Sequence, residues 1–177
     1  MASISGTGLT FPDNSVLSGI IGTNYIARWA VSSQTSGSGS NDIYCNLEVA
    51  MPAPRSNNSR YLLMTEVHCD DTNSDTAGVG LSFWVANNTS SYWVDQQGHH
   101  SEYFSGGADH YFTQQNVHID DGTTADSPNI LTNSGRTYRV YGDANNSNIW
   151  FCTTHVGGRI GWTGYLLVVE LDGGLFS

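Results

Sequence analysis

The stretch Trp162-Thr-Gly-Tyr-Leu-Leu-Val-Val-Glu-Leu171 is a nearly continuous apolar run, and no other segment of the chain is as hydrophobic. Such a run is typical of a strand that is buried on both faces, because a strand with one solvent face alternates apolar and polar residues. Something must therefore cover each face of this strand. The sequence predicts that the remaining strands close around residues 162–171.

The rest of the chain has a period of two. Apolar side chains recur at every second position, as in half-buried strands, over residues 25–31, 43–51, 61–69 and 79–85. Residues 92–94 are expected to pair back as a hairpin, and strands at 137–141 and 148–155 precede the central one. Gly, Asn or Pro interrupts nearly every helical window, so no helix is expected. The pattern predicts an all-β fold, a single jelly-roll β-sandwich of about eight to ten antiparallel strands.

The chain has 177 residues, enough for one domain with a full core. Residues 1–22 carry few strand signals apart from Leu9–Phe11, so we expect an extended N-terminal arm that attaches to neighbouring subunits or other proteins. Residues 23–177 are expected to form the sandwich domain.

Charged residues make up only 12% of the chain, against about 25% in ordinary soluble domains. The chain contains no lysine and has a formal net charge of −10. This balance argues against binding nucleic acid or an anionic membrane, both of which require clustered basic residues. No apolar stretch approaches the roughly 20 residues of a membrane span, and no secretion signal opens the sequence. A surface of neutral polar residues and carboxylates favours an external protein, either secreted or carried on a virion. Because no secretion signal is present, we expect a protein made in a host cytoplasm and released by lysis, as a phage virion component is.

The three cysteines, Cys45, Cys69 and Cys152, are widely spaced and form no Cys-x-x-Cys pair. Each lies in a strand-like segment, where a free cysteine behaves as a small apolar core residue. One disulfide between two of them is the alternative.

Residues Ser5–Leu17 contain Gly-Thr-Gly, an apolar residue and Phe-Pro-Asp. This segment resembles short linkers that recur in tail fibres and other virion proteins of tailed phages, although Asn14 replaces the usual glycine. The resemblance implies a virion protein whose N-terminal arm contacts other virion components.

The end of the chain, with Gly135-Arg-Thr-Tyr-Arg-Val-Tyr141, Ile149-Trp-Phe-Cys-Thr-Thr154 and Gly161-Trp-Thr-Gly-Tyr-Leu-Leu167, resembles the closing half of the C1q/TNF-like jelly roll. The resemblance covers about forty residues, and it implies a homotrimer with the last strand at its centre. The expected subunit contacts are Phe11, Trp162, Tyr165, Leu167 and Val169. Gly164, inside the apolar strand, marks a bulge or a close backbone approach.

The middle of the chain is rich in aromatic and histidine side chains, which are suited to stacking on sugar rings and binding hydroxyl groups. The candidate ligand-binding residues are Trp93, His99, His100, Tyr103, Phe104, His110 and Tyr111. The same side chains could instead be core or intersubunit packing.

Two oxygen-rich turns resemble calcium loops in composition but not in spacing. The candidate ligands are Asp70, Asp71 and Asp75, with ordinary acidic turns as the alternative. The histidines match no zinc signature either. We therefore expect no cofactor, with Ca²⁺ as the alternative.

No motif supports catalysis. Gly37-Ser-Gly39 lacks the strand-to-helix elbow of a hydrolase nucleophile, and the paired carboxylates lie in turns. We expect a non-enzymatic, homotrimeric structural protein on the surface of a tailed-phage virion, either a head decoration or a small fibre or spike protein. The alternative is a lectin-like, glycan-binding receptor-recognition module of a tail fibre.

Overall fold

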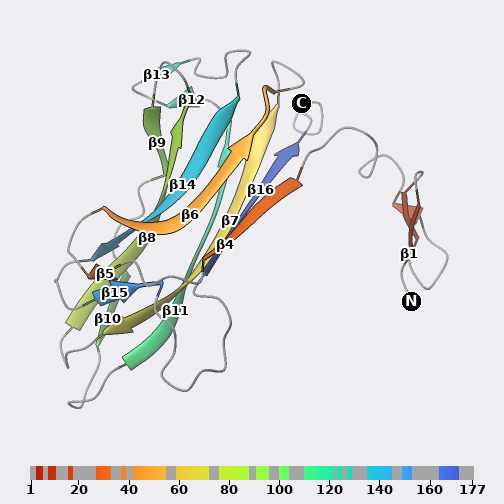
Figure 1. Ribbon diagram of the computed structural model, residues 1–177. Helices are drawn as coiled ribbons and strands as arrows, with labels where there is room; N and C mark the ends of the chain where they lie inside the picture. The colour runs from red at the N-terminus through yellow and green to blue at the C-terminus, as the bar shows by residue number, and fades with distance from the viewer. Residues whose placement is uncertain are drawn as a thin grey trace.

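A computed structural model of the chain shows two antiparallel β-sheets packed face to face (Figure 1). The structure describes residues 42–54, 59–71, 76–87, 91–95, 100–103, 110–121, 135–144, 149–152 and 164–171, and short strands at 3–5, 8–10, 16–17, 27–32, 37–38, 123–124 and 127–128. These ranges contain no helix, and so none that could span a membrane. The predicted all-β sandwich is confirmed.

The first sheet, which we call the β14 sheet, has the strand order β10-β8-β14-β6, and β9 also pairs with β8. Its strands are β6 (Ile43–Met51), β8 (Thr76–Ala86), β9 (Ser91–Asp95), β10 (His100–Tyr103) and β14 (Arg136–Ala144). The hairpin expected at residues 79–94 is confirmed, because β8 and β9 pair in antiparallel register.

The second sheet, which we call the β16 sheet, has the order β4-β16-β7-β15-β5, and β11 also pairs with β7. Its strands are β4 (Ala27–Ser32), β5 (Gly37–Ser38), β7 (Arg60–Asp71), β11 (His110–Asp120), β15 (Ile149–Phe151) and β16 (Gly164–Leu171). The chain crosses repeatedly between the two sheets, so that the late strands β14 and β16 each lie between two earlier ones. This interleaved order is that of a jelly roll.

Two further small sheets complete the described strands. One contains β1 (Ser3–Ser5), β2 (Gly8–Thr10) and β3 (Val16–Leu17), and the other pairs β12 (Thr123–Thr124) with β13 (Ser127–Pro128). The first lies within the predicted arm of residues 1–22, where a short strand was expected at Leu9–Phe11.

The inner faces of the two sheets form the core. Along β6 and β14, residues alternate between buried and outward positions, as the period of two predicted. The largest fully buried aromatic side chains are Tyr61, Tyr138, Phe83 and Phe151. None of the three cysteines forms a disulfide, and all are fully buried, as expected for core residues.

Close packing requires glycine at positions that include Gly142, against the opposite sheet, and Gly164, against the neighbouring strand β7. A Cβ atom at Gly142 would lie 2.3 Å from the ring of Phe151, and one at Gly164 would lie 2.8 Å from the carbonyl oxygen of Glu66. Real Cβ atoms do not approach so closely, so side chains are excluded at both positions. The close backbone approach predicted at Gly164 is confirmed.

The central strand differs from its prediction in one respect. Leu166 and Val168 are fully buried against the opposite sheet, whereas Tyr165, Leu167 and Val169 point outward and are only half-buried. Within one chain, β16 is therefore buried on one face only. The physical reason is that the sandwich has two layers, and no third layer among the described residues covers the outer side of β16.

Buried polar groups connect the two sheets. Asp120 of β11 accepts hydrogen bonds from the hydroxyls of Tyr92 (3.1 Å) and Tyr138 (2.7 Å), which lie in the opposite sheet. Asn116 donates through Nδ2 to the carbonyl oxygen of Leu81 at 2.8 Å. Burial, followed by the charge of Asp120, raises the pKa of Tyr138 well above its ordinary value, so this phenol stays protonated as a donor. These contacts give Asp120 a structural role.

Candidate functional site

The outer side of the β16 sheet carries an apolar surface, which we call the apolar face. It is formed by outward residues of three adjacent strands, β16, β7 and β11 (Figure 1). Its members are Leu62, Met64, Val117, Ile119, Tyr165, Leu167 and Val169. Val117 is 59% exposed and Ile119 is 44% exposed, which is unusual for two neighbouring aliphatic residues on one strand face.

Strand register places these side chains in rows across the sheet. Val169 pairs with Leu62, which pairs with Ile119. In the adjacent row, Leu167 pairs with Met64, which pairs with Val117. The apolar face is thus continuous across three strands, with Val117 and Ile119 exposed and its other members half-buried.

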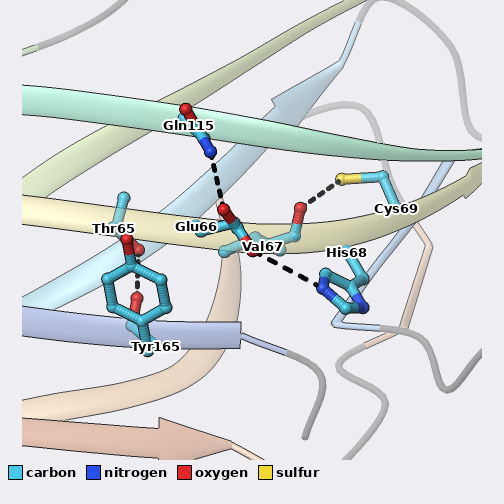
Figure 2. Close-up of polar contacts among 7 residues, drawn as sticks. All are labelled: Thr65, Glu66, Val67, His68, Cys69, Gln115 and Tyr165. Atoms are coloured by element: carbon cyan, nitrogen blue, oxygen red, sulfur yellow. Dashed lines mark hydrogen bonds and ion pairs between the residues drawn. The ribbon is translucent and has the colours of Figure 1, made fainter. Parts of the chain in front are cut away.

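The next row is polar and borders the apolar face. Figure 2 shows Gln115 of β11 beside Glu66 of β7, with Nε2 donating to Glu66 Oε2 at 2.6 Å. His68 Nε2 lies 3.7 Å from the other carboxylate oxygen of Glu66. The backbone of Tyr165 is held by Thr65, whose Oγ1 donates a hydrogen bond to the carbonyl oxygen of Tyr165 at 2.6 Å. This row gives the apolar face a hydrogen-bonded polar border on one side.

The outer side of the β14 sheet carries a different surface, which we call the aromatic face. Tyr141 of β14 is its centre. Its ring lies 5.5 Å from the ring of Tyr44, 6.4 Å from that of Trp84 and 5.2 Å from that of Trp93. The two tryptophans meet Tyr141 edge-to-face, a favourable arrangement for aromatic pairs. All four residues are half-buried and point away from the core.

An ion pair lies among these rings. Arg139 Nε donates to Glu48 Oε2 at 2.5 Å, across the pairing of β14 with β6. The guanidinium of Arg139 also lies 5.1 Å from the ring centre of Trp84 and 5.7 Å from that of Tyr44, both cation–π contacts. The hydrogen bond to Glu48 raises the pKa of Arg139. The aromatic face therefore combines ring surfaces with a fixed donor and a fixed acceptor, and the pair is neutral overall.

The described residues that were predicted to bind sugar lie on three strands, β9, β10 and β11. Trp93 lies on the aromatic face, in β9, which pairs with one end of β8. His100 and Tyr103 belong to β10, which pairs with the other end of β8. His110 and Tyr111 begin β11, in the opposite sheet. His99 and Phe104 lie outside the described residues. Of the predicted set, only Trp93 is placed on the aromatic face.

The predicted metal ligands and subunit contacts are only partly described. Asp70 and Asp71 end β7 and pair with the first residues of β11, while Asp75 lies outside the described residues. Among the side chains that the structure describes, no group of three potential metal ligands occurs. Of the predicted subunit contacts, Tyr165, Leu167 and Val169 lie on the apolar face, and Phe11 and Trp162 fall outside the described ranges.

The sequence prediction missed Tyr44, Trp84 and Tyr141. Each lies in a strand that was predicted correctly, but in the phase of the alternation that points away from the core. A large aromatic residue in the outward phase was the available signal. The candidate residues of the sequence lie mostly in the loop-rich middle of the chain, whereas strands position the side chains of the aromatic face.

No family model matches the sequence, and no curated protein matches it. Among solved structures, 33 chains match. A structure of the Gt strain of infectious bursal disease virus has 9% identity and a TM-score of 0.38, with 85% of this chain and 34% of that chain covered. The T13 viral particle of the same virus has 10% identity and a TM-score of 0.39, with 85% of this chain and 32% of that chain covered. Its VP2 subviral particle has 12% identity and a TM-score of 0.35, with 85% of this chain and 33% of that chain covered.

This chain spans about a third of the length of these three virus chains. Similarity at this level of identity concerns the fold, and TM-scores below 0.4 give no argument about function.

Proposed function

We propose that the protein is a non-enzymatic structural component of a tailed-phage virion, a homotrimer displayed on the particle surface as a head decoration or a small fibre or spike protein. Residues 1–22 contact other virion proteins, and the sandwich points outward. The observation that carries this proposal is the apolar face.

The apolar face supports assembly because β16 is more hydrophobic than one chain requires. Tyr165, Leu167 and Val169 are apolar at positions where a strand with a solvent face would carry polar residues. Complete burial of one Val or Ile side chain contributes about 1.5–3 kcal/mol. Contact with neighbouring subunits around a threefold axis would cover this face in every copy and would leave the aromatic face outward.

The choice of a virion component rests on the sequence. The segment Ser5–Leu17 resembles phage virion linkers, and residues 135–167 resemble the closing half of a trimeric jelly roll. The lysine-free, neutral polar composition is that of an external protein. The jelly-roll sandwich is compatible with these resemblances, but the fold alone does not imply a virion protein.

Light scattering coupled to size exclusion tests the trimer. Three chains of 19.2 kDa should give a particle of about 58 kDa at micromolar concentration. Val117→Asp, which places a charge on the apolar face, should give a folded monomer. A monomer in the unchanged protein would overturn the proposal.

Thr113→Asp is the matched control. Thr113 is exposed on the same strand and the same face as Val117, but it lies beyond the polar row of Gln115. This variant adds the same charge and should remain trimeric. If both variants dissociate, added charge rather than the apolar face controls assembly. The virion location is tested separately by mass spectrometry of purified particles from the host culture.

A further inference from the structure

We propose that the aromatic face, formed by Tyr44, Trp84, Trp93 and Tyr141 around the Arg139–Glu48 pair, binds a neutral polysaccharide. The inference uses side chains of the β14 sheet only. It therefore stands independently of the assembly proposed for the apolar face on the other side of the sandwich.

The first argument is the kind of surface. Four aromatic rings and an arginine gather on one sheet face, although nothing in the described chain packs over them as a second layer. Trp, Tyr and Arg are the side chains that contribute most binding energy at recognition surfaces. Each ring is fixed by its neighbours, so binding would cost little side-chain entropy.

The second argument is the match to a pyranose ring. One side of such a sugar carries C–H groups, which pack on an aromatic ring, and its edge carries hydroxyl groups, which need donors and acceptors. The aromatic face supplies both, because Arg139 and Glu48 lie beside the rings of Tyr44 and Trp84. Their side chains are 36% and 43% exposed, respectively, so their remaining hydrogen-bonding capacity is accessible.

The third argument is charge. Aromatic rings also stack on nucleic-acid bases, but a protein with a net charge of −10 and no lysine repels a phosphate backbone. The arginine of the aromatic face is neutralised by Glu48 at 2.5 Å, which leaves little attraction for a polyanion. A neutral, ring-rich polymer is the chemistry that fits both the rings and the charge.

Affinity electrophoresis tests the proposal, with native gels containing a neutral glucan, mannan or galactan. At least one polysaccharide should retard the protein, and Trp93→Ala should weaken this binding about tenfold or more. Glu48→Gln, which keeps the size of the side chain, should weaken it to a smaller degree. Titration of the bound polysaccharide should also change tryptophan fluorescence in the unchanged protein, and Trp93→Phe should reduce this change.

Trp150→Ala is the matched control, because Trp150 is an exposed tryptophan of the β16 sheet, away from the aromatic face. It should bind as the unchanged protein does. Mobility that is unaffected by all three polysaccharides would overturn the proposal, and so would equal binding by Trp93→Ala. Retardation by single-stranded DNA in place of the polysaccharides would identify a base-binding face and would equally overturn it. Light scattering on the same samples reports assembly separately, so failure of one proposal leaves the other tested on its own.

Discussion

Asp120 shows how this sandwich accommodates a carboxylate in its interior. An isolated charge inside a protein is costly, but both oxygens of Asp120 accept hydrogen bonds from tyrosines of the opposite sheet. Arg136 lies nearby in β14, with its guanidinium 4.6 Å from the ring centre of Tyr61. Its positive charge lowers the pKa of Tyr138, which partly opposes the effect of Asp120. The two sheets are thus connected by phenol–carboxylate contacts.

Alkaline pH should weaken these contacts. The pKa of Tyr138 is raised above the ordinary value of 10.0, so above about pH 10 the unfolded chain releases a proton that the native protein retains. The contribution of Tyr138 to stability is therefore complete below pH 10 and falls as the pH rises further. Where the native protein retains one proton that the unfolded chain has released, the free energy of unfolding falls by about 1.4 kcal/mol per pH unit. Urea unfolding at pH 8, 10 and 11 should show a shallower alkaline loss for Tyr138→Phe.

Tyr138→Phe also removes a hydrogen bond to Asp120, which lowers stability at every pH. The change in slope above pH 10 is the diagnostic quantity. Equal slopes in the two proteins would contradict the raised pKa.

At the scale of a strand, β16 separates two roles along its length. Leu166 and Val168 fill the core, while Leu167 and Val169 belong to the apolar face. If β16 were buried on both faces within one chain, Leu167→Asp would abolish folding and assembly together. In the structure, side chains alternate along β16, so a charge at Leu166 should disrupt folding and a charge at Leu167 should disrupt assembly.

Leu166→Asp should unfold the protein, because it places a charge in a fully buried position, a change that costs more than about 4 kcal/mol. Leu167→Asp should retain the folded sandwich and lose the proposed trimeric assembly. Near-ultraviolet circular dichroism reports folding in both variants, and light scattering reports mass. Loss of the folded spectrum in Leu167→Asp would show that this residue belongs to the core after all.

The sequence was most informative for strands with a regular alternation. Residues 43–51 were predicted and found as one strand, because each second side chain is apolar. The sequence was least informative about which layer, or which chain, covers each face of a strand. The apolar run of β16 is compatible with a strand buried by its own chain or by a neighbour, and only the fold distinguishes these. Trp84 was missed for a related reason: its position on the aromatic face depends on β9 and β14 lying on either side of β8.

At the scale of the whole molecule, the core joins residues that are distant in the sequence. Cys45, Cys69 and Cys152 come from β6, from β7 and from the residue after β15, and all three are fully buried. Burial, more than the neighbouring thiols, raises the pKa of Cys45 and Cys69 well above the ordinary value. Buried thiols are shielded from reagents in solvent, and a raised pKa keeps them in the unreactive protonated form.

A thiol reagent should therefore report global unfolding. At pH 8 the native protein should react far more slowly than the urea-unfolded chain, which should yield three thiols. The native rate should rise with urea in proportion to the unfolded population, because a thiol between two sheets is reached only when they separate. Rapid labelling of one cysteine in the native state would contradict this expectation.

The two-layer construction also has an evolutionary consequence. The outer surfaces of the sheets are separated by a core about 10 Å thick and share no side chains, and substitutions so separated are usually additive in their effects. The aromatic face can therefore diversify residue by residue while the apolar face is held constant. On the two proposals above, a lineage of such proteins would keep one mode of assembly while the ligand that it recognises changes.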